Sequence, residues 1–142
     1  MRKAFTLVEI ISVMGMMLLL FGISLPVYQS LMFGSDVENA QKILVSTLRT
    51  AQVQSMAVQD DSKWGVHITS TQLVLFQGGS YLTRVQAYDI PYSLPSNLTV
   101  TSPGDIVFTK VYGLPETIGT ITITKNEKLT TIIINSRGVQ TY

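Results

Sequence analysis

The chain has 142 residues, of which 46% are hydrophobic and only 13% are charged. This composition excludes a disordered, highly charged chain and suits one small domain, with or without an apolar anchor. The formal net charge is +1 and therefore gives no indication of a nucleic-acid partner. There is no cysteine, which excludes disulfides and thiolate metal sites.

An almost wholly apolar run extends from Phe5 to Leu25, and its only charged residue is Glu9. As an α-helix this run is about 31 Å long, which matches a hydrocarbon core of roughly 30 Å. Arg2 and Lys3 precede the run, and no basic residue follows it closely. The sequence therefore predicts a single-pass transmembrane helix with a cytoplasmic N-terminus and the rest of the chain outside the cytoplasm.

Glu9 distinguishes between three interpretations of this run. The first is a secretory signal peptide cut near Gly22-Ile23-Ser24, and the second is a plain signal anchor; neither explains a carboxylate among apolar residues. In the third, the chain is cut after Ala4, and Glu9 lies one helical turn from the free amine of Phe5. The carboxylate can then pair with that amine in its own chain or in a neighbouring subunit.

At these residues the sequence resembles the type IV pilin family, which includes the pseudopilins of type II secretion. The family has a short basic leader and a small residue, usually Gly, followed by Phe-Thr-Leu-x-Glu. Here Arg2-Lys3-Ala4 precedes Phe5-Thr6-Leu7-Val8-Glu9. The resemblance implies cleavage by prepilin peptidase between Ala4 and Phe5, N-methylation of Phe5, and neutralisation of a neighbour's N-terminus by Glu9 during assembly.

The same resemblance implies where the protein acts and with what. It implies an inner-membrane protein whose globular region is periplasmic or extracellular and which is incorporated into a filament. The implied partners are other pilins or pseudopilins, prepilin peptidase and an inner-membrane assembly platform. The implied fold is pilin-like.

The chain divides by pattern into four segments. These are a leader at residues 1–4, a transmembrane or filament-core helix at 5–27, an amphipathic helix at 28–61 that continues it, and a β-rich globular region at 62–142. Within the second helix, from about residue 36 to residue 59, apolar residues at spacings of three and four predict one buried stripe. The stripe consists of Val37, Ala40, Leu44, Leu48 and Ala51.

Gly22 and Pro26 predict a break in the long helix. Pro26 has no N–H for the carbonyl of Gly22, and Gly22 is itself a weak helix former. The alternative is that Pro26 marks the membrane exit.

The C-terminal half is composed of short runs rich in Val, Ile, Thr and Tyr that are separated by turn residues, which predicts antiparallel strands. The expected fold class is α+β, with one long helix laid against an antiparallel sheet. Residues 120–124 alternate strictly and predict one solvated face, whereas Ile132-Ile133-Ile134 predicts burial on both faces. The predicted strands are 63–69, 72–77, 81–90, 98–101, 105–110, 117–125, 130–135 and 139–142.

Scattered features of the globular region resemble the H-type minor pseudopilins, shared with FimT-type minor pilins. The resemblance implies a minor, tip-associated subunit that helps filament initiation or assembly and is not an enzyme. The alternative is a signal-anchored extracytoplasmic binding module, such as a DNA-uptake minor pilin. The features are Leu48-Arg49-Thr50-Ala51, Trp64-Gly65-Val66, Ile106-Val107-Phe108 with Gly113, and Arg137-Gly138.

No catalytic residue, cofactor site or metal site is predicted. His67 is the only histidine and is interpreted as an ordinary strand residue. Lys125, Lys128 and Arg137 could cluster, but three charges give weak, salt-sensitive binding, so nucleic acid is not the expected partner.

Overall fold

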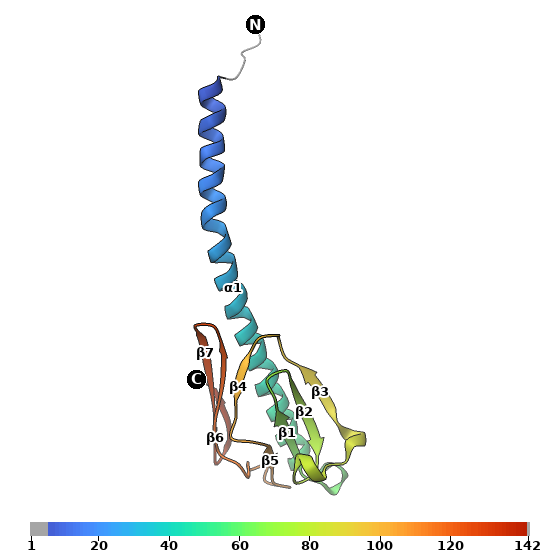
Figure 1. The fold of residues 1–142 in the computed structure, drawn as a ribbon. Helices are drawn as coiled ribbons and strands as arrows, with labels where there is room; N and C mark the ends of the chain where they lie inside the picture. Colours follow the sequence, from blue (N-terminus) through green and yellow to red (C-terminus); the bar gives the residue numbers. More distant parts are fainter. Residues whose placement is uncertain (1–5, 142) are drawn as a thin grey trace. The chain divides into compact units, whose positions relative to one another are not determined.

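The computed structural model describes residues 6–141, apart from the side chains of residues 23–34 and 139–141. The chain separates into two compact units, Met1–Gly34 and Ser35–Tyr142, each of which is described by itself. One helix, α1 (Leu7–Met56), leads into a 3₁₀ turn at Gln59–Asp61, and eight strands follow in the described residues (Figure 1). The strands are β1 (Trp64–Ile68), β2 (Gln72–Gln77), β3 (Ile90–Ser93), β4 (Thr99–Thr101), β5 (Ile106–Phe108), β6 (Gly119–Lys125), β7 (Lys128–Asn135) and β8 (Gly138–Thr141).

The strands form two four-stranded sheets rather than one. In the first sheet the order is β3-β2-β1-β5, and in the second it is β4-β6-β7-β8, with antiparallel pairing throughout. Gly65 lies in β1 between the two neighbouring strands, where a Cβ atom would come within 2.8 Å of the Phe76 ring and 2.9 Å of Val107. Glycine therefore permits this close packing inside the first sheet.

The core of the second unit forms where both sheets meet the C-terminal part of α1. The predicted helix stripe is confirmed, because every one of its five residues is at most 4% exposed. Strand side chains from both sheets join the stripe in one apolar cluster, so α1 is the element on which the two sheets pack. The strand members include Trp64, Val66, Leu73, Leu75, Ile106, Phe108, Ile121, Ile123, Ile132 and Ile134.

The prediction of a transmembrane first half is wrong, and so is the single-pass inner-membrane localisation that followed from it. Within the part of the chain that the structure describes, no helix is both long enough and apolar enough to cross a membrane.

Three further predictions are corrected in the second unit. A single antiparallel sheet was expected, but the strands divide into two sheets. The predicted strand at 81–90 is instead two 3₁₀ turns, Tyr81–Thr83 and Gln86–Tyr88, followed by β3. Ile133 is 37% exposed, so the isoleucine run of β7 is not buried on both faces. The alternation in β6 is confirmed, because Ile121 and Ile123 are fully buried.

Candidate functional site

The N-terminal stretch of α1 exposes apolar side chains all around its circumference. From Leu7 to Phe21 the large hydrophobic residues are between 49% and 75% exposed. A helix that is apolar on every side is normally covered by other apolar groups, and soluble monomers rarely expose contiguous apolar patches larger than a few hundred Å². This stretch is therefore a candidate surface for contact with other molecules.

Glu9 lies in the first turn of α1, where its backbone N–H has a local partner that the sequence analysis missed. The Glu9 backbone N–H donates to the carbonyl of Thr6 at 3.1 Å and lies 3.3 Å from the Thr6 hydroxyl oxygen, which accepts from it. Thr6 thus caps the helix, and the signal was present in the sequence as Thr-x-x-Glu, the capping-box spacing. A carboxylate in the first turn is also favoured by the positive end of the helix dipole.

Several predicted site residues cannot be placed against this turn. Ala4 and Phe5, the predicted cleavage pair, lie outside the described residues. The backbone of α1 is helical through Gly22 and Pro26, but the side chain of Pro26 is among those not described. The predicted processing and the predicted helix break therefore stay predictions.

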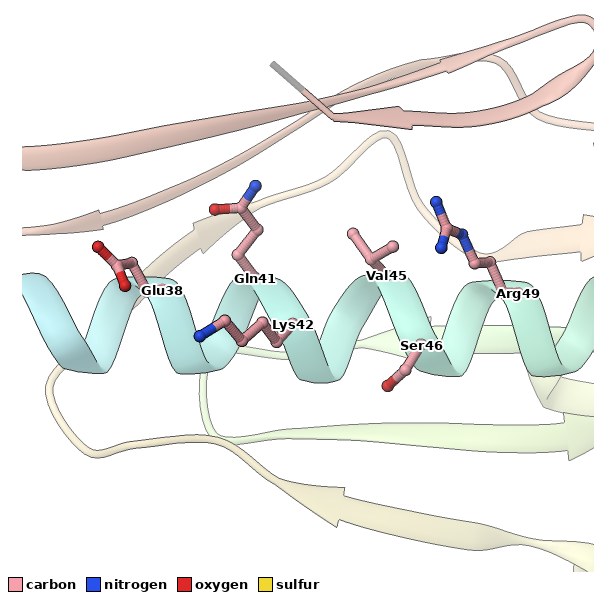
Figure 2. A pocket seen from close by; sticks show the side chains of 6 residues that line it. All are labelled: Glu38, Gln41, Lys42, Val45, Ser46 and Arg49. Carbon is pink, nitrogen blue, oxygen red and sulfur yellow. The ribbon is translucent and has the colours of Figure 1, made fainter.

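A second candidate site is an open groove of about 790 Å³ beside α1 in the second unit (Figure 2). Gln41, Val45 and Arg49 point from the helix toward the hairpin of β7 and β8. Val45 is half-buried against the core, whereas Arg49 is exposed. The groove has one apolar lining residue, Val45, and three charged ones; its lining residues are Glu38, Gln41, Lys42, Val45, Ser46 and Arg49.

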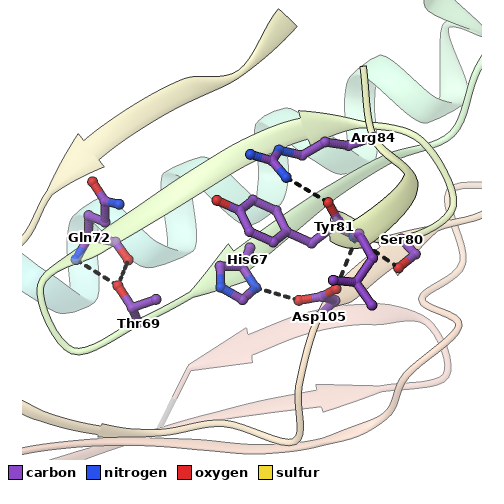
Figure 3. A network of polar contacts seen from close by, with 8 residues as sticks. His67, Thr69, Gln72, Ser80, Tyr81, Arg84 and Asp105 are labelled. Carbon is purple, nitrogen blue, oxygen red and sulfur yellow. Dashed lines mark hydrogen bonds and ion pairs between the residues drawn. The ribbon is translucent and has the colours of Figure 1, made fainter. Parts of the chain in front are cut away.

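The third feature is a side-chain network that holds the segment after β2 (Figure 3). The Tyr81 ring lies between two partners: the His67 imidazole stacks on it at 3.8 Å and the Arg84 guanidinium lies 3.7 Å from its centroid. Asp105 accepts a 3.1 Å hydrogen bond from the Tyr81 backbone N–H and forms a 2.6 Å contact with His67 Nδ1. Arg84 in turn pairs with Asp89 at 2.7 Å.

This network explains why residues 81–90 do not form the predicted strand. Asp105 and His67 come from other parts of the chain, so the contacts that pin Tyr81 were not readable from local periodicity. The network fixes a segment whose Leu82 side chain is 91% exposed. The hydroxyl of Ser80 accepts from the Leu82 N–H, so it caps a turn.

Of the basic residues considered for nucleic acid, Lys125 lies opposite Lys128 in the β6–β7 pair, whereas Arg137 lies in the turn between β7 and β8. Lys125 pairs with Asp36 at 2.7 Å and donates to the Ser96 carbonyl at 2.9 Å. Lys128 and Arg137 are exposed. Among the described residues, no group of three or more histidine or acidic side chains is placed to hold a metal ion.

Comparison with known proteins gives no relative on which to base a function: no protein family, no curated protein and no solved structure matches the chain.

Proposed function

We propose that this chain is a type IV pilin-like filament subunit, of the minor pilin or pseudopilin kind, which helps filament initiation or assembly. The observation that supports the proposal is the exposed apolar stretch of α1, residues 7–21, which begins within the Phe-Thr-Leu-x-Glu motif of residues 5–9. In a bundle of such helices each stretch is covered by the stretches of its neighbours. Burial of apolar surface is the main driving force of stable association.

Glu9 supplies the specific part of this association. It is the only charged residue of the apolar stretch, so inside a helix bundle its carboxylate needs a cationic partner. The α-amine of a processed neighbour that begins at Phe5 is such a partner. Pairing the two groups fixes the register between adjacent helices, because a shifted helix would leave both charges unpaired.

Thr6 caps α1 through the backbone N–H of Glu9, so two substitutions separate the cap from the charge of the Glu9 side chain. Glu9→Gln keeps the capping-box geometry, since glutamine also serves at this position, but removes the charge. Thr6→Ala removes the hydroxyl that caps the helix but keeps the Glu9 charge. The two variants are therefore matched controls for each other.

The proposal predicts opposite outcomes for the two variants in cells that assemble filaments. Glu9→Gln should be produced normally but absent from sheared filaments, because leaving one member of a buried ion pair unpaired costs about 3–5 kcal/mol. Thr6→Ala should enter filaments at close to the wild-type level, because loss of a cap costs only about 1 kcal/mol. If Thr6→Ala is excluded and Glu9→Gln is incorporated, the helix cap and not the Glu9 charge governs incorporation, and the assembly mechanism is wrong.

The proposal also includes maturation at Ala4 and Phe5. Mass spectrometry of the protein from such cells should find N-methylated Phe5 as the first residue. A mature chain that starts within residues 22–25 would show that the apolar run is a cleavable signal peptide and would contradict the proposal.

A further inference from the structure

The second sheet ends in a strand with one free edge. Among the described residues β8 pairs with β7 alone, with Ile134 opposite Val139 and Asn135 opposite Gly138. In an antiparallel ladder, alternate residues of an edge strand direct their N–H and C=O groups away from the sheet. Such an edge is a template on which another extended chain can pair.

The groove on α1 lies along this free edge. A Cβ on Gly138, at the start of β8, would lie 3.0 Å from the Gln52 side chain, and Thr130 of β7 donates to Gln41 at 3.1 Å. The strand β8 therefore starts near Gln52 and runs toward lower residue numbers of α1, opposite to the helix direction. Figure 2 shows the lining side chains Gln41, Val45 and Arg49 directed at this hairpin.

The lining residues have the spacing of an extended chain. Gln41, Val45 and Arg49 follow one another at four-residue intervals, which is about 6 Å along a helix. Side chains on one face of a strand repeat every two residues, about 6.6 Å apart. One face of an added strand can thus place its successive side chains opposite successive positions of the groove.

The charges of the groove give the added strand a direction. Glu38 lies at one end, the half-buried Val45 lies in the middle, and Arg49 lies at the other end. Lys42 also lines the groove between Glu38 and Val45, but Figure 2 shows that its side chain is not directed at the hairpin. In the part of the chain that is described, neither Glu38 nor Arg49 takes part in an ion pair. A complementary strand has a basic residue opposite Glu38, an apolar residue opposite Val45 and an acidic residue opposite Arg49.

We propose that this groove binds an extended segment of a partner protein, which pairs antiparallel with β8 and whose inward side chains run from basic through apolar to acidic. Antiparallel pairing is the more stable arrangement, and it makes the bound segment run in the direction of α1, from Glu38 toward Arg49. Backbone pairing supplies affinity and the groove supplies sequence preference. The inference does not depend on filament assembly.

Synthetic peptides test both the pairing and the direction on the full chain in mild detergent. The forward probe is acetyl-Lys-Thr-Ser-Thr-Val-Thr-Glu-amide, whose alternate residues match the groove. The reversed probe has the same residues in the opposite order and would need parallel pairing to satisfy both charges. A third probe is the forward peptide with N-methyl groups on the amides that face β8, which removes its donors but leaves its side chains unchanged.

Calorimetric titration should rank the forward probe first. The N-methylated probe should bind at least about tenfold more weakly, because it loses several backbone hydrogen bonds of about 0.5–1.5 kcal/mol. The reversed probe should also bind more weakly, because antiparallel pairing would place its acidic end opposite Glu38 and its basic end opposite Arg49. Binding of the forward probe should also slow hydrogen exchange at alternate backbone amides of β8. Equal affinities for the three probes, or no binding by the forward probe at millimolar concentration, would overturn the proposal.

Charge reversal locates the binding site. Arg49→Glu should weaken the forward probe about three- to fivefold, as expected for an exposed ion pair turned into a repulsion. A probe ending in Lys instead of Glu should recover that loss on the variant but not on the wild-type chain. Lys128→Glu makes the same charge change at an exposed position outside the groove and should leave the affinity unchanged. If Lys128→Glu weakens binding as much as Arg49→Glu, the probe senses only net charge and the assigned site is wrong.

Discussion

Replacing Ser55 by alanine should destabilise the second unit by more than the same substitution at the exposed Ser46 of α1. Ser55 is fully buried near the end of the helix. Its hydroxyl oxygen accepts from the Trp64 N–H at 2.9 Å, and the hydroxyl lies 3.3 Å from the Trp64 carbonyl, to which it donates. The Ser55 carbonyl also accepts from the Val111 N–H at 3.2 Å. One residue thus joins the helix to β1 and to the loop after β5.

The size of the destabilisation follows from the hydrogen-bonding groups that Ser55→Ala leaves without a partner. The substitution deletes both hydroxyl interactions and leaves the Trp64 N–H buried without this acceptor. A buried donor without a partner costs about 1–3 kcal/mol, so the free energy of unfolding should fall by that amount. The carbonyl bond to Val111 does not involve the side chain and should remain.

Ser46 provides the matched control on the same helix. Its hydroxyl donates to the Ile43 carbonyl at 2.9 Å, but the residue is exposed. Ser46→Ala should change stability by no more than about 0.5 kcal/mol, because water replaces the lost bond and alanine is the better helix former.

Urea denaturation followed by tryptophan fluorescence measures both variants. Trp64 is the only tryptophan and is 2% exposed, so its emission reports unfolding of the second unit. Amide exchange at Trp64 should also accelerate in Ser55→Ala and not in Ser46→Ala. Equal unfolding free energies for the two variants would refute the reasoning that Ser55 satisfies a buried donor.

Three further substitutions test other parts of the second unit. Leu44→Ala removes a side chain that is 1% exposed in the helix stripe and should cost about 2–5 kcal/mol in thermal or urea unfolding; a loss below 1 kcal/mol would contradict the assigned core. Gly113→Ala should destabilise the same transition by at least about 1 kcal/mol, because φ is +60° and a Cβ would lie 2.9 Å from Met56 Sδ; an unchanged midpoint would show that the loop relaxes. Asp36→Asn should lower the free energy of unfolding by about 1.5–3 kcal/mol, because the side chain of its partner Lys125 is only 10% exposed. Asp61→Asn, at a side chain that is 92% exposed, should lower it by at most about 1 kcal/mol. The reverse order would show that burial does not determine how much these ion pairs contribute.

The elements that the sequence predicted correctly are those whose signal is local and periodic. The helix stripe through Leu44 and Leu48 repeats at helical spacing, and the strand that carries Ile121 and Ile123 alternates, so each pattern identifies its buried face. The capping role of Thr6 was equally local, because Thr-x-x-Glu is a readable spacing, but the acidic residue was interpreted only as a partner for an amine.

The predictions that failed in the second unit depended on contacts between residues that are distant in the sequence. Residues 81–90 have strand-like composition, yet Asp105 binds the Tyr81 backbone and His67 stacks on its ring, which favours turns over a strand. The division into two sheets depends on which strand pairs with β1, and a distant segment, β5, takes that place. The groove on α1 was also missed, because it lies beside β8, and the position of β8 in the second sheet cannot be predicted from local sequence.

The contact made by the apolar stretch of α1 is the central claim, and one cross-linking measurement tests it most directly. Because the chain has no cysteine, Leu18→Cys provides a single attachment point for a benzophenone cross-linker at a position that is 73% exposed. Irradiation of cells that assemble filaments should join the Leu18→Cys variant to a pilin-like subunit. Mass spectrometry should map the attachment to that subunit's own N-terminal apolar helix. Ser46→Cys, on the exposed side of the same helix in the second unit, should not give this product. If Leu18→Cys attaches only to proteins without such a helix, or to none, the chain is not a filament subunit of this kind.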